Sequence, residues 1–223
     1  MMEGYDPDRH HRRSIRLKGY DYSRSGAYFV TIVVRNRRCL FGDVDGNDMR
    51  LNEAGDMVAA VWNSMTLRFA DIDLDGFVVM PNHIHGIIVL THEETPSVGA
   101  PLVGAHGIVN AHGIVGAPIP DRDTGEIGAI GANVGIGAPR GAPTIGDIVG
   151  AYKSLTTVHY TRGVTNDGWP PFAGLLWQRN YYEHIIRDDA ALNRIRQYIM
   201  ENPARWAEDT ENPGWQPHNR EGS

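Results

Sequence analysis

Two histidines, His83 and His85, have a spacing that could bind a metal ion. They lie in the apolar stretch 78–90 with one residue, Ile84, between them. In an extended strand alternate side chains project to the same face, so the two imidazoles would lie about 7 Å apart along the strand and could chelate one divalent cation. Ile84 would point to the opposite face, into a core. Such a pair also occurs as two ordinary histidines, so the rest of the chain has to separate the two interpretations.

Tyr198 and Asn202, close to the C-terminal end, could add a hydroxyl and an amide oxygen. They are four residues apart in a segment with helical spacing, so they share one face of a helix. An amide oxygen can bind a hard cation, and the hydroxyl would lie beside it. Taken alone, Tyr198 also fits a partly buried tyrosine with a solvated hydroxyl. Tyr181 and Tyr182 compete for any role given to a tyrosine.

Length and composition limit the class of protein. The 223 residues suffice for one sizeable domain, or one domain with an appendage. The single cysteine, Cys39, excludes an intramolecular disulfide framework and a cysteine-rich zinc site. The chain has no apolar run of membrane-spanning length, and residues 1–13 lack the hydrophobic core of a signal peptide. We therefore expect a soluble, cytoplasmic protein with no membrane partner.

The charge is unevenly distributed. The net charge of −6 argues mildly against a nucleic-acid partner, but residues 10–40 contain eight arginines and lysines against one acid, Asp21. A basic patch on an acidic protein is therefore possible, because a total charge hides its distribution. A solvated basic arm is the alternative.

The apolar pattern predicts four strands and three helices. The strands are expected at 27–34, 72–80, 83–90 and 175–186. The helices are expected after Asn52, near Thr144, and from Asp188 or Asp189 to about Asn202, where Pro203 ends the last one. The order β, α, β, β, α, β, α predicts an α+β fold, a ferredoxin-like split βαβ antiparallel sheet with an added C-terminal helix.

Glycine content divides the chain into parts. Residues 95–150 contain 13 of the 26 glycines, with repeated Gly-Ala-Pro, and offer little large apolar surface to offset their ordering entropy. We therefore predict one domain formed by residues 1–94 and 144–206. Residues 95–143 would form a flexible Gly/Ala/Pro-rich insertion, and residues 207–223 a flexible tail.

The chain resembles the REP-associated tyrosine transposases, a branch of the single-tyrosine HUH transposases of bacterial insertion sequences. Four matches occur in the expected order and cover most of the chain outside the insertion. They are an N-terminal strand region within 13–32, the His-hydrophobic-His motif with its lead-in at 79–85 (VMPNHIH), a strand region at 177–187, and the sequence YIMENP at 198–203.

The resemblance implies a chemical mechanism. Tyr198, on the C-terminal nucleophile-bearing helix, would attack a scissile phosphate, forming a 5′-phosphotyrosine and releasing a 3′-hydroxyl. His83 and His85 would hold Mg²⁺ or Mn²⁺, and Asn202 matches the polar residue that completes the metal shell.

The resemblance also implies a substrate. The family acts on single-stranded DNA that carries hairpins, as monomers or as homodimers, which implies a nucleoid-associated protein. Tyr20, Tyr22 and Trp177 could stack on unpaired bases. The expected phosphate contacts are Arg12, Arg13, Arg16, Lys18, Arg35, Arg37, Arg38 and Lys153.

Three alternative functions share features with this sequence. A domesticated protein could bind repeat DNA without cutting it, and no residue needed for catalysis is missing to favour that reading. A histidine-triad nucleotide hydrolase needs a third histidine where this chain has Ile87. A replication-initiation nuclease shares the site chemistry, but a single-tyrosine helix in a small chain fits the transposase branch better.

Overall fold

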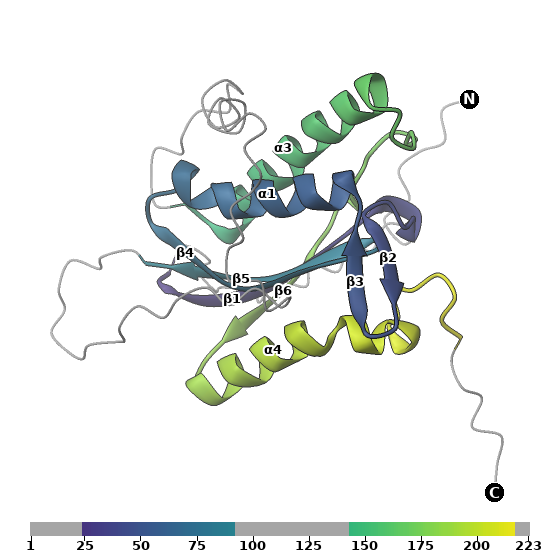
Figure 1. Cartoon of the computed structure of the whole chain (residues 1–223). Coiled ribbons are helices and arrows are strands. Elements are labelled where there is room, and N and C mark those ends of the chain that lie inside the picture. Colours follow the sequence, from purple (N-terminus) through teal and green to yellow (C-terminus); the bar gives the residue numbers. More distant parts are fainter. Residues whose placement is uncertain (1–23, 92–142, 217–223) are drawn as a thin grey trace, which may run out of the picture.

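A computed structural model describes residues 24–91 and 143–216 of the chain (Figure 1). The basic arm at 12–18 and almost all of the predicted insertion lie outside these residues. In the described part, no helix is long and apolar enough to cross a membrane.

The centre of the molecule is a four-stranded antiparallel sheet. Its strands are β1 (Gly26–Val33), β4 (Ile72–Met80), β5 (His83–Leu90) and β6 (Tyr182–Ile186). They lie in the order β4-β5-β1-β6, so each βαβ unit is split by a strand of the other unit. This order confirms the predicted ferredoxin-like α+β fold. It also places the His-x-His strand, β5, inside the sheet between β4 and β1.

Helices cover both faces of the sheet. Helices α1 (Glu53–Arg68) and α3 (Ile145–Asn166) pack side by side on one face, and α4 (Asp189–Glu201) lies against the other (Figure 1). Each helix begins at a polar cap, and two of the caps, Asn52 and Asp188, are residues at which the sequence predicted a helix to start. The caps are Asn52, Thr144 and Asp188, and Thr144 forms a reciprocal capping box with Asp147.

Alternation along β5 divides the apolar residues between two cores. Ile84 lies fully buried in the larger core, between the sheet and helices α1 and α3. In that core the ring of Trp62 stacks on Phe77 with centroids 4.7 Å apart. The smaller core lies between the sheet and α4. Its buried members are Phe29, Val78, Met80, Ile87, Ile186 and Ile199.

Two elements differ from the predicted pattern. A hairpin of β2 (Gly42–Asp45) and β3 (Asp48–Leu51) is present but was not expected, because each strand is only four residues long and has at most two apolar side chains, too few to indicate a strand. The last strand is shorter than the predicted 175–186. Before Tyr182, the chain pairs with the end of the first strand at one position only, an isolated antiparallel bridge between Trp177 and Val34.

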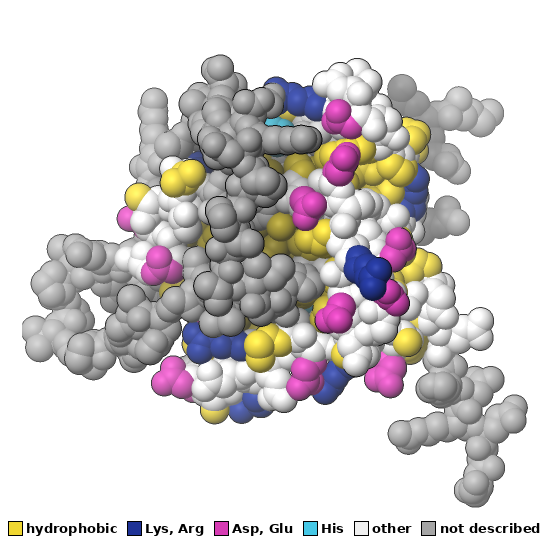
Figure 2. Space-filling model, in the orientation of Figure 1, with side chains coloured by type: hydrophobic (Ala, Val, Ile, Leu, Met, Phe, Trp, Pro, Cys, Tyr) yellow, Lys and Arg dark blue, Asp and Glu magenta, His cyan; other side chains and the backbone are white. Residues whose placement is uncertain are grey.

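Charged side chains do not form a broad field of one sign on the face shown in Figure 2. Acidic and basic groups are interspersed over its described surface. On this face a polyanion would therefore bind to small local groups of basic side chains and not to one broad basic surface.

A substitution at Gly86 would test how closely α1 packs on β5, the His-x-His strand. A Cβ atom at this position would lie 2.3 Å from Cζ2 of Trp62. We expect Gly86→Ala to lower the free energy of unfolding by about 1–3 kcal/mol, because the core is overpacked. Gly150→Ala is the matched control, since its Cβ would meet nothing within 4 Å in α3. It should raise stability by about 0.5–1 kcal/mol. Urea unfolding measures both, and a neutral Gly86→Ala would contradict this packing.

Candidate active site

His83 and His85 lie side by side on the face of β5 that α4 covers. Their Nε2 atoms are 3.1 Å apart, and the two residues are 0% and 4% exposed. Ile84 points to the opposite face, as strand alternation predicts. The pair is therefore fixed on a central strand, which holds side chains more firmly than a loop does.

Asn82 determines which nitrogen of His83 carries the proton. Its amide nitrogen donates to the carbonyl oxygens of Arg37 at 2.9 Å and Glu211 at 2.7 Å. Its Oδ1 therefore faces Nδ1 of His83, 2.9 Å away. An amide oxygen only accepts, so Nδ1 of His83 must donate. In neutral His83 the lone pair is then on Nε2, which faces His85.

His85 is held by its neighbours on β1. The hydroxyl of Thr31, its partner across the strands, lies 2.8 Å from Nδ1, and the ring of Phe29 stacks on the imidazole with centroids 5.3 Å apart. A hydroxyl can donate or accept, so Thr31 suits either tautomer of His85. His85 can thus place a proton between the two Nε2 atoms, or offer a lone pair there.

Burial keeps both imidazoles neutral. It lowers the pKa of His83 to about 3, and burial together with His83 lowers the pKa of His85 well below its ordinary value. Neutral imidazole is the form that binds metal ions. Around neutral pH, protons therefore do not compete with a cation at this pair.

Asp209 supplies a carboxylate to the pair. Its Oδ2 lies 3.5 Å from Nε2 of His83, and ligand atoms of His83, His85 and Asp209 all lie within 4.8 Å of one another. The backbone N–H of Glu211 donates to its Oδ1 at 2.7 Å, which fixes the carboxylate. Burial raises the pKa of Asp209, because removal from water disfavours the charged carboxylate.

Asp209 was not expected from the sequence, because residues 207–223 were predicted to form a flexible tail. That assignment is wrong for 207–216. The short helix η2 (Pro203–Glu208) follows α4 directly, and its Trp206 packs against the smaller core, with its ring centroid 6.0 Å from that of His83. A tryptophan one turn after Asn202 was the available signal that the chain stays packed beyond Pro203.

Tyr198 reaches the pair from α4. Its hydroxyl lies 3.5 Å from Nε2 of His85, and the side chain is 40% exposed. Burial and the charge of Asp209 raise its pKa, while Asn202 acts in the opposite direction. Of the competing tyrosines, Tyr181 packs against the larger core on the other face of the sheet. Tyr182 is 45% exposed and contacts Phe29 edge-on, on the same face as the site.

Asn202 is buried with an unused acceptor. It is 3% exposed, and its Oδ1 has no hydrogen-bond partner within the described residues. An unsatisfied buried acceptor costs about 1–3 kcal/mol, so such an atom often marks a site completed by an ion or a ligand. The two imidazole nitrogens of His83 and His85 and the carboxylate of Asp209 lie close enough together to bind one divalent cation. The residues present therefore fit a divalent cation.

Arg196 helps to hold α4 in position. Its guanidinium makes a two-pronged ion pair with Asp75, next to the irregularity in β4 between Leu74 and Phe77. The pair lowers the pKa of Asp75. On the same helix, Ile199 is 1% exposed in the smaller core. These two contacts fix the turn of α4 that carries Tyr198.

The residues predicted to contact phosphate differ in their surroundings. Arg12, Arg13, Arg16 and Lys18 lie outside the described residues, as do Tyr20 and Tyr22. Arg37 pairs with Glu211 at 2.7 Å, and Arg38 donates to the carbonyl oxygen of Pro171 at 2.7 Å. Arg35 is exposed at the edge of a hollow.

Lys153 and Trp177 have structural roles. The ammonium of Lys153 donates to the carbonyl oxygens of Gln178 at 3.0 Å and Asn180 at 3.1 Å, and so supports the segment that leads into β6. Burial lowers its pKa to about 8. Trp177 is 3% exposed, and its Nε1 donates to Thr156. The expectation that Trp177 stacks on bases is therefore wrong, because its ring is enclosed in the core.

The tautomer of His83 can be measured directly. In metal-free protein we expect ¹⁵N NMR to show neutral His83 with the proton on Nδ1 throughout about pH 5–8. Because its folded pKa is about 3, against about 6.5 when unfolded, the native state binds fewer protons between these values. Stability should therefore decrease as pH falls through this window. Titration of His83 near pH 6.5, or a proton on Nε2 alone, would contradict the site described above.

Comparison with known proteins gives relatives in sequence and in fold. No protein-family model matches the chain. A REP-associated tyrosine transposase bound to a REP hairpin has a similar structure, with a TM-score of 0.44 and 16% identity over 86% of this chain and 74% of that one. A candidate transposase from Deinococcus radiodurans has a TM-score of 0.37 and 14% identity over 84% and 96%. At these scores, the chemistry of the site has to be judged from its own residues.

A bacterial protein is similar to this chain in sequence. A Haemophilus influenzae protein described as uncharacterized is 35% identical over 212 residues, which cover 94% of this chain and 97% of that protein. The chain belongs to the same protein family as this Haemophilus influenzae protein.

Proposed function

We propose that the protein is a metal-dependent transposase that nicks and rejoins single-stranded DNA through a 5′-phosphotyrosine. The observation that carries the proposal is the meeting of a tyrosine hydroxyl with a buried cluster of metal ligands. The hydroxyl of Tyr198 lies 3.5 Å from Nε2 of His85, beside the group formed by His83, His85 and Asp209. The resemblance of four sequence segments to the REP-associated tyrosine transposases supports the same function.

The reaction we propose is a transesterification. The Tyr198 oxygen attacks the scissile phosphorus, an O–P bond forms, and the bond from phosphorus to the 3′-oxygen breaks. The departing 3′-oxygen takes up a proton and becomes a hydroxyl. The phenol proton passes to water, which can reach a side chain that is 40% exposed. Attack by a 3′-hydroxyl on the phosphotyrosine reverses the step, so rejoining needs no high-energy cofactor.

The metal would be held by His83, His85 and Asp209, with Asn202 as a further oxygen donor. Asp209 is our addition to the ligand set expected from sequence. A divalent cation bound there would act as a Lewis acid on the phosphate. Asn82 and Thr31 orient the two imidazoles through their Nδ1 atoms, which is how outer hydrogen bonds tune metal ligands.

The DNA substrate would approach along the arginines of the turn at 35–38, which follows β1. We propose that the arm at 12–18 and the turn at 35–38 contact phosphates, and that the substrate carries a hairpin with an unpaired flank. Lys153 is left out of this surface, because its ammonium is engaged with backbone carbonyls.

Tyr198→Phe tests the nucleophile. We expect wild-type protein with Mn²⁺ and a hairpin with a single-stranded flank, taken from DNA beside its own gene, to form a covalent protein–DNA band on a denaturing gel. Tyr198→Phe should reduce this band by at least about 1,000-fold, because no other oxygen replaces the nucleophile. EDTA should remove it.

Tyr182→Phe is the matched control, because Tyr182 lies on the same face and is similarly exposed. It should keep the band. A band that survives in Tyr198→Phe and disappears in Tyr182→Phe would move the nucleophile to β6. If both proteins shift the hairpin in a native gel and neither forms the band, the protein binds DNA without cutting it.

Asp209→Asn tests the ligand set. We expect it to weaken Mn²⁺ binding by at least about tenfold in calorimetry, since even residues one shell further out change affinity by that much. Glu208→Gln removes the same charge from the neighbouring exposed residue and should leave the affinity unchanged. If Asp209→Asn binds Mn²⁺ as tightly as wild type, Asp209 is not a ligand.

A further inference from the structure

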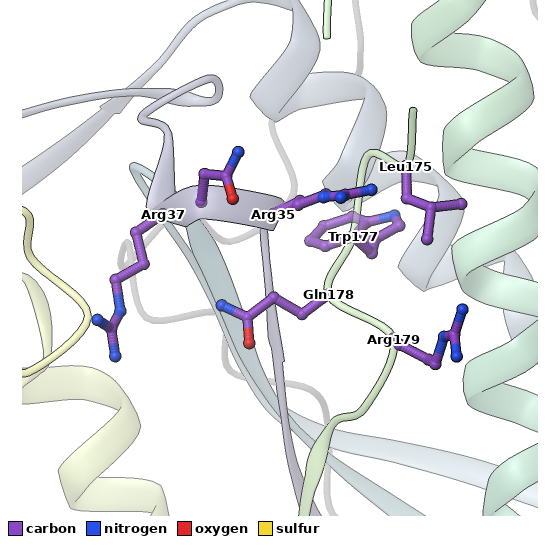
Figure 3. Close-up of a pocket in the computed structure, with 7 residues that line it drawn as sticks. Arg35, Arg37, Leu175, Trp177, Gln178 and Arg179 are labelled. Atoms are coloured by element: carbon purple, nitrogen blue, oxygen red, sulfur yellow. The ribbon is translucent and has the colours of Figure 1, made fainter. Parts of the chain in front are cut away.

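A hollow of about 550 Å³ lies at the end of the sheet next to the site (Figure 3). The turn that follows β1 lines one side with Arg35, Asn36 and Arg37, and residues 175–179 line the other. This volume lies within the range of small-ligand pockets, about 300–1,000 Å³. The hollow has room for one or two nucleotides, and it is too small for a duplex.

The lining of the hollow is positively charged. It contains Arg35, Arg37 and Arg179 and no acidic residue. Arg37 is paired with Glu211. Arg35 and Arg179 are exposed, and within residues 24–91 and 143–216 no acidic side chain forms an ion pair with either. Two guanidinium groups are thus available to an anion, and their planar fork suits a phosphate group.

The turn that carries Arg35 and Arg37 is strained. Asn36 and Arg37 have φ angles of 59° and 53°, in the left-handed region that residues other than glycine rarely occupy. Each such residue costs on the order of 1 kcal/mol and is held by its surroundings. Here the carbonyl of Arg37 accepts from the buried amide of Asn82. As a result, Arg37 extends toward the C-terminal segment, while Arg35 extends the other way, over Trp177 (Figure 3).

The guanidinium of Arg35 packs against the backbone of Gly174. Gly174 has a φ of 75°, and a Cβ atom there would lie 3.0 Å from Nη1 of Arg35. The guanidinium therefore packs closely on a residue that has no side chain. Trp177, below it, is 3% exposed and cannot stack on a base. The hollow thus offers guanidinium contacts to phosphate, and the amides of Asn36 and Gln178 are its uncharged polar side chains.

We propose that this hollow binds the phosphodiester backbone of the unpaired DNA strand that enters the active site, with Arg35 and Arg179 contacting successive phosphates. The inference rests on the proposed function and names the path of its substrate. The two places are physically joined, because Asn82 bonds Arg37 of the turn on one side and His83 of the metal cluster on the other. Contacts to phosphate position a strand without reading its sequence, so binding here is sequence-tolerant.

The test compares two double variants of equal charge. Arg35→Gln/Arg179→Gln removes both proposed contacts. Arg24→Gln/Arg187→Gln is the control, because these exposed arginines flank the far end of the sheet, where Ile186 pairs with Ala27. Fluorescence anisotropy over a series of salt concentrations measures binding of a hairpin that carries a single-stranded flank. The same hairpin without the flank is measured in parallel, and thermal unfolding checks that both variants fold.

For Arg35→Gln/Arg179→Gln, we expect the slope of log affinity against log salt to fall by about 1.4, since each single-strand phosphate contact contributes about 0.7. At about 0.1 M salt this corresponds to an affinity about 25-fold lower for the flanked hairpin. The control should bind like wild type, and the hairpin without the flank should not distinguish the variants.

An unchanged slope and affinity in Arg35→Gln/Arg179→Gln, or an equal loss in the control, would overturn the inference. The covalent band of the wild-type protein separates this failure from failure of the proposed function. If the band forms but the flank binds equally to both variants, the nicking activity stands and the hollow is not its path. If no band forms but the flank binding is lost, the hollow binds single strands and the nicking proposal is wrong.

Discussion

The buried amide of Asn82 is the contact on which the site depends. One side chain, fully excluded from water, donates to the carbonyls of Arg37 and Glu211 and accepts from His83. It therefore joins the strained arginine turn, the C-terminal segment and His83. Because a buried amide left without partners costs several kcal/mol, these three segments must be in place together. The site is thus assembled by the fold and not by a flexible loop.

The two faces of β5 have different tasks. One face places Ile84 and Ile88 in the larger core, and the other presents the two histidines to α4. Burial beside apolar side chains gives the imidazoles low pKa values, which keeps their lone pairs free. The same burial would make two facing lone pairs unfavourable at 3.1 Å, unless a proton or a cation lies between them. Packing and site chemistry therefore act through the same strand.

Sequence patterns predicted what depends on periodicity. The four apolar runs were enough to predict the sheet, the polar residues Asn52 and Asp188 to predict where two helices begin, and the alternation around Ile84 to predict the orientation of the histidines. Asp209 could not be predicted in this way, because its turn is joined to the site by contacts distant in sequence, from Asn82 and Arg37 to Glu211. The enclosure of Trp177 has the same cause: its ring is covered by Phe41 and Tyr152, from other parts of the chain.

The central claim is that residues from β5, α4 and the segment after it form one metal centre. Crystals grown with Mn²⁺ and measured for anomalous scattering would test it most directly. We predict a single peak within bonding distance of Nε2 of His83, Nε2 of His85 and Oδ2 of Asp209. The account would be contradicted if Mn²⁺ saturated the crystal elsewhere while the two Nε2 atoms remained in contact with each other.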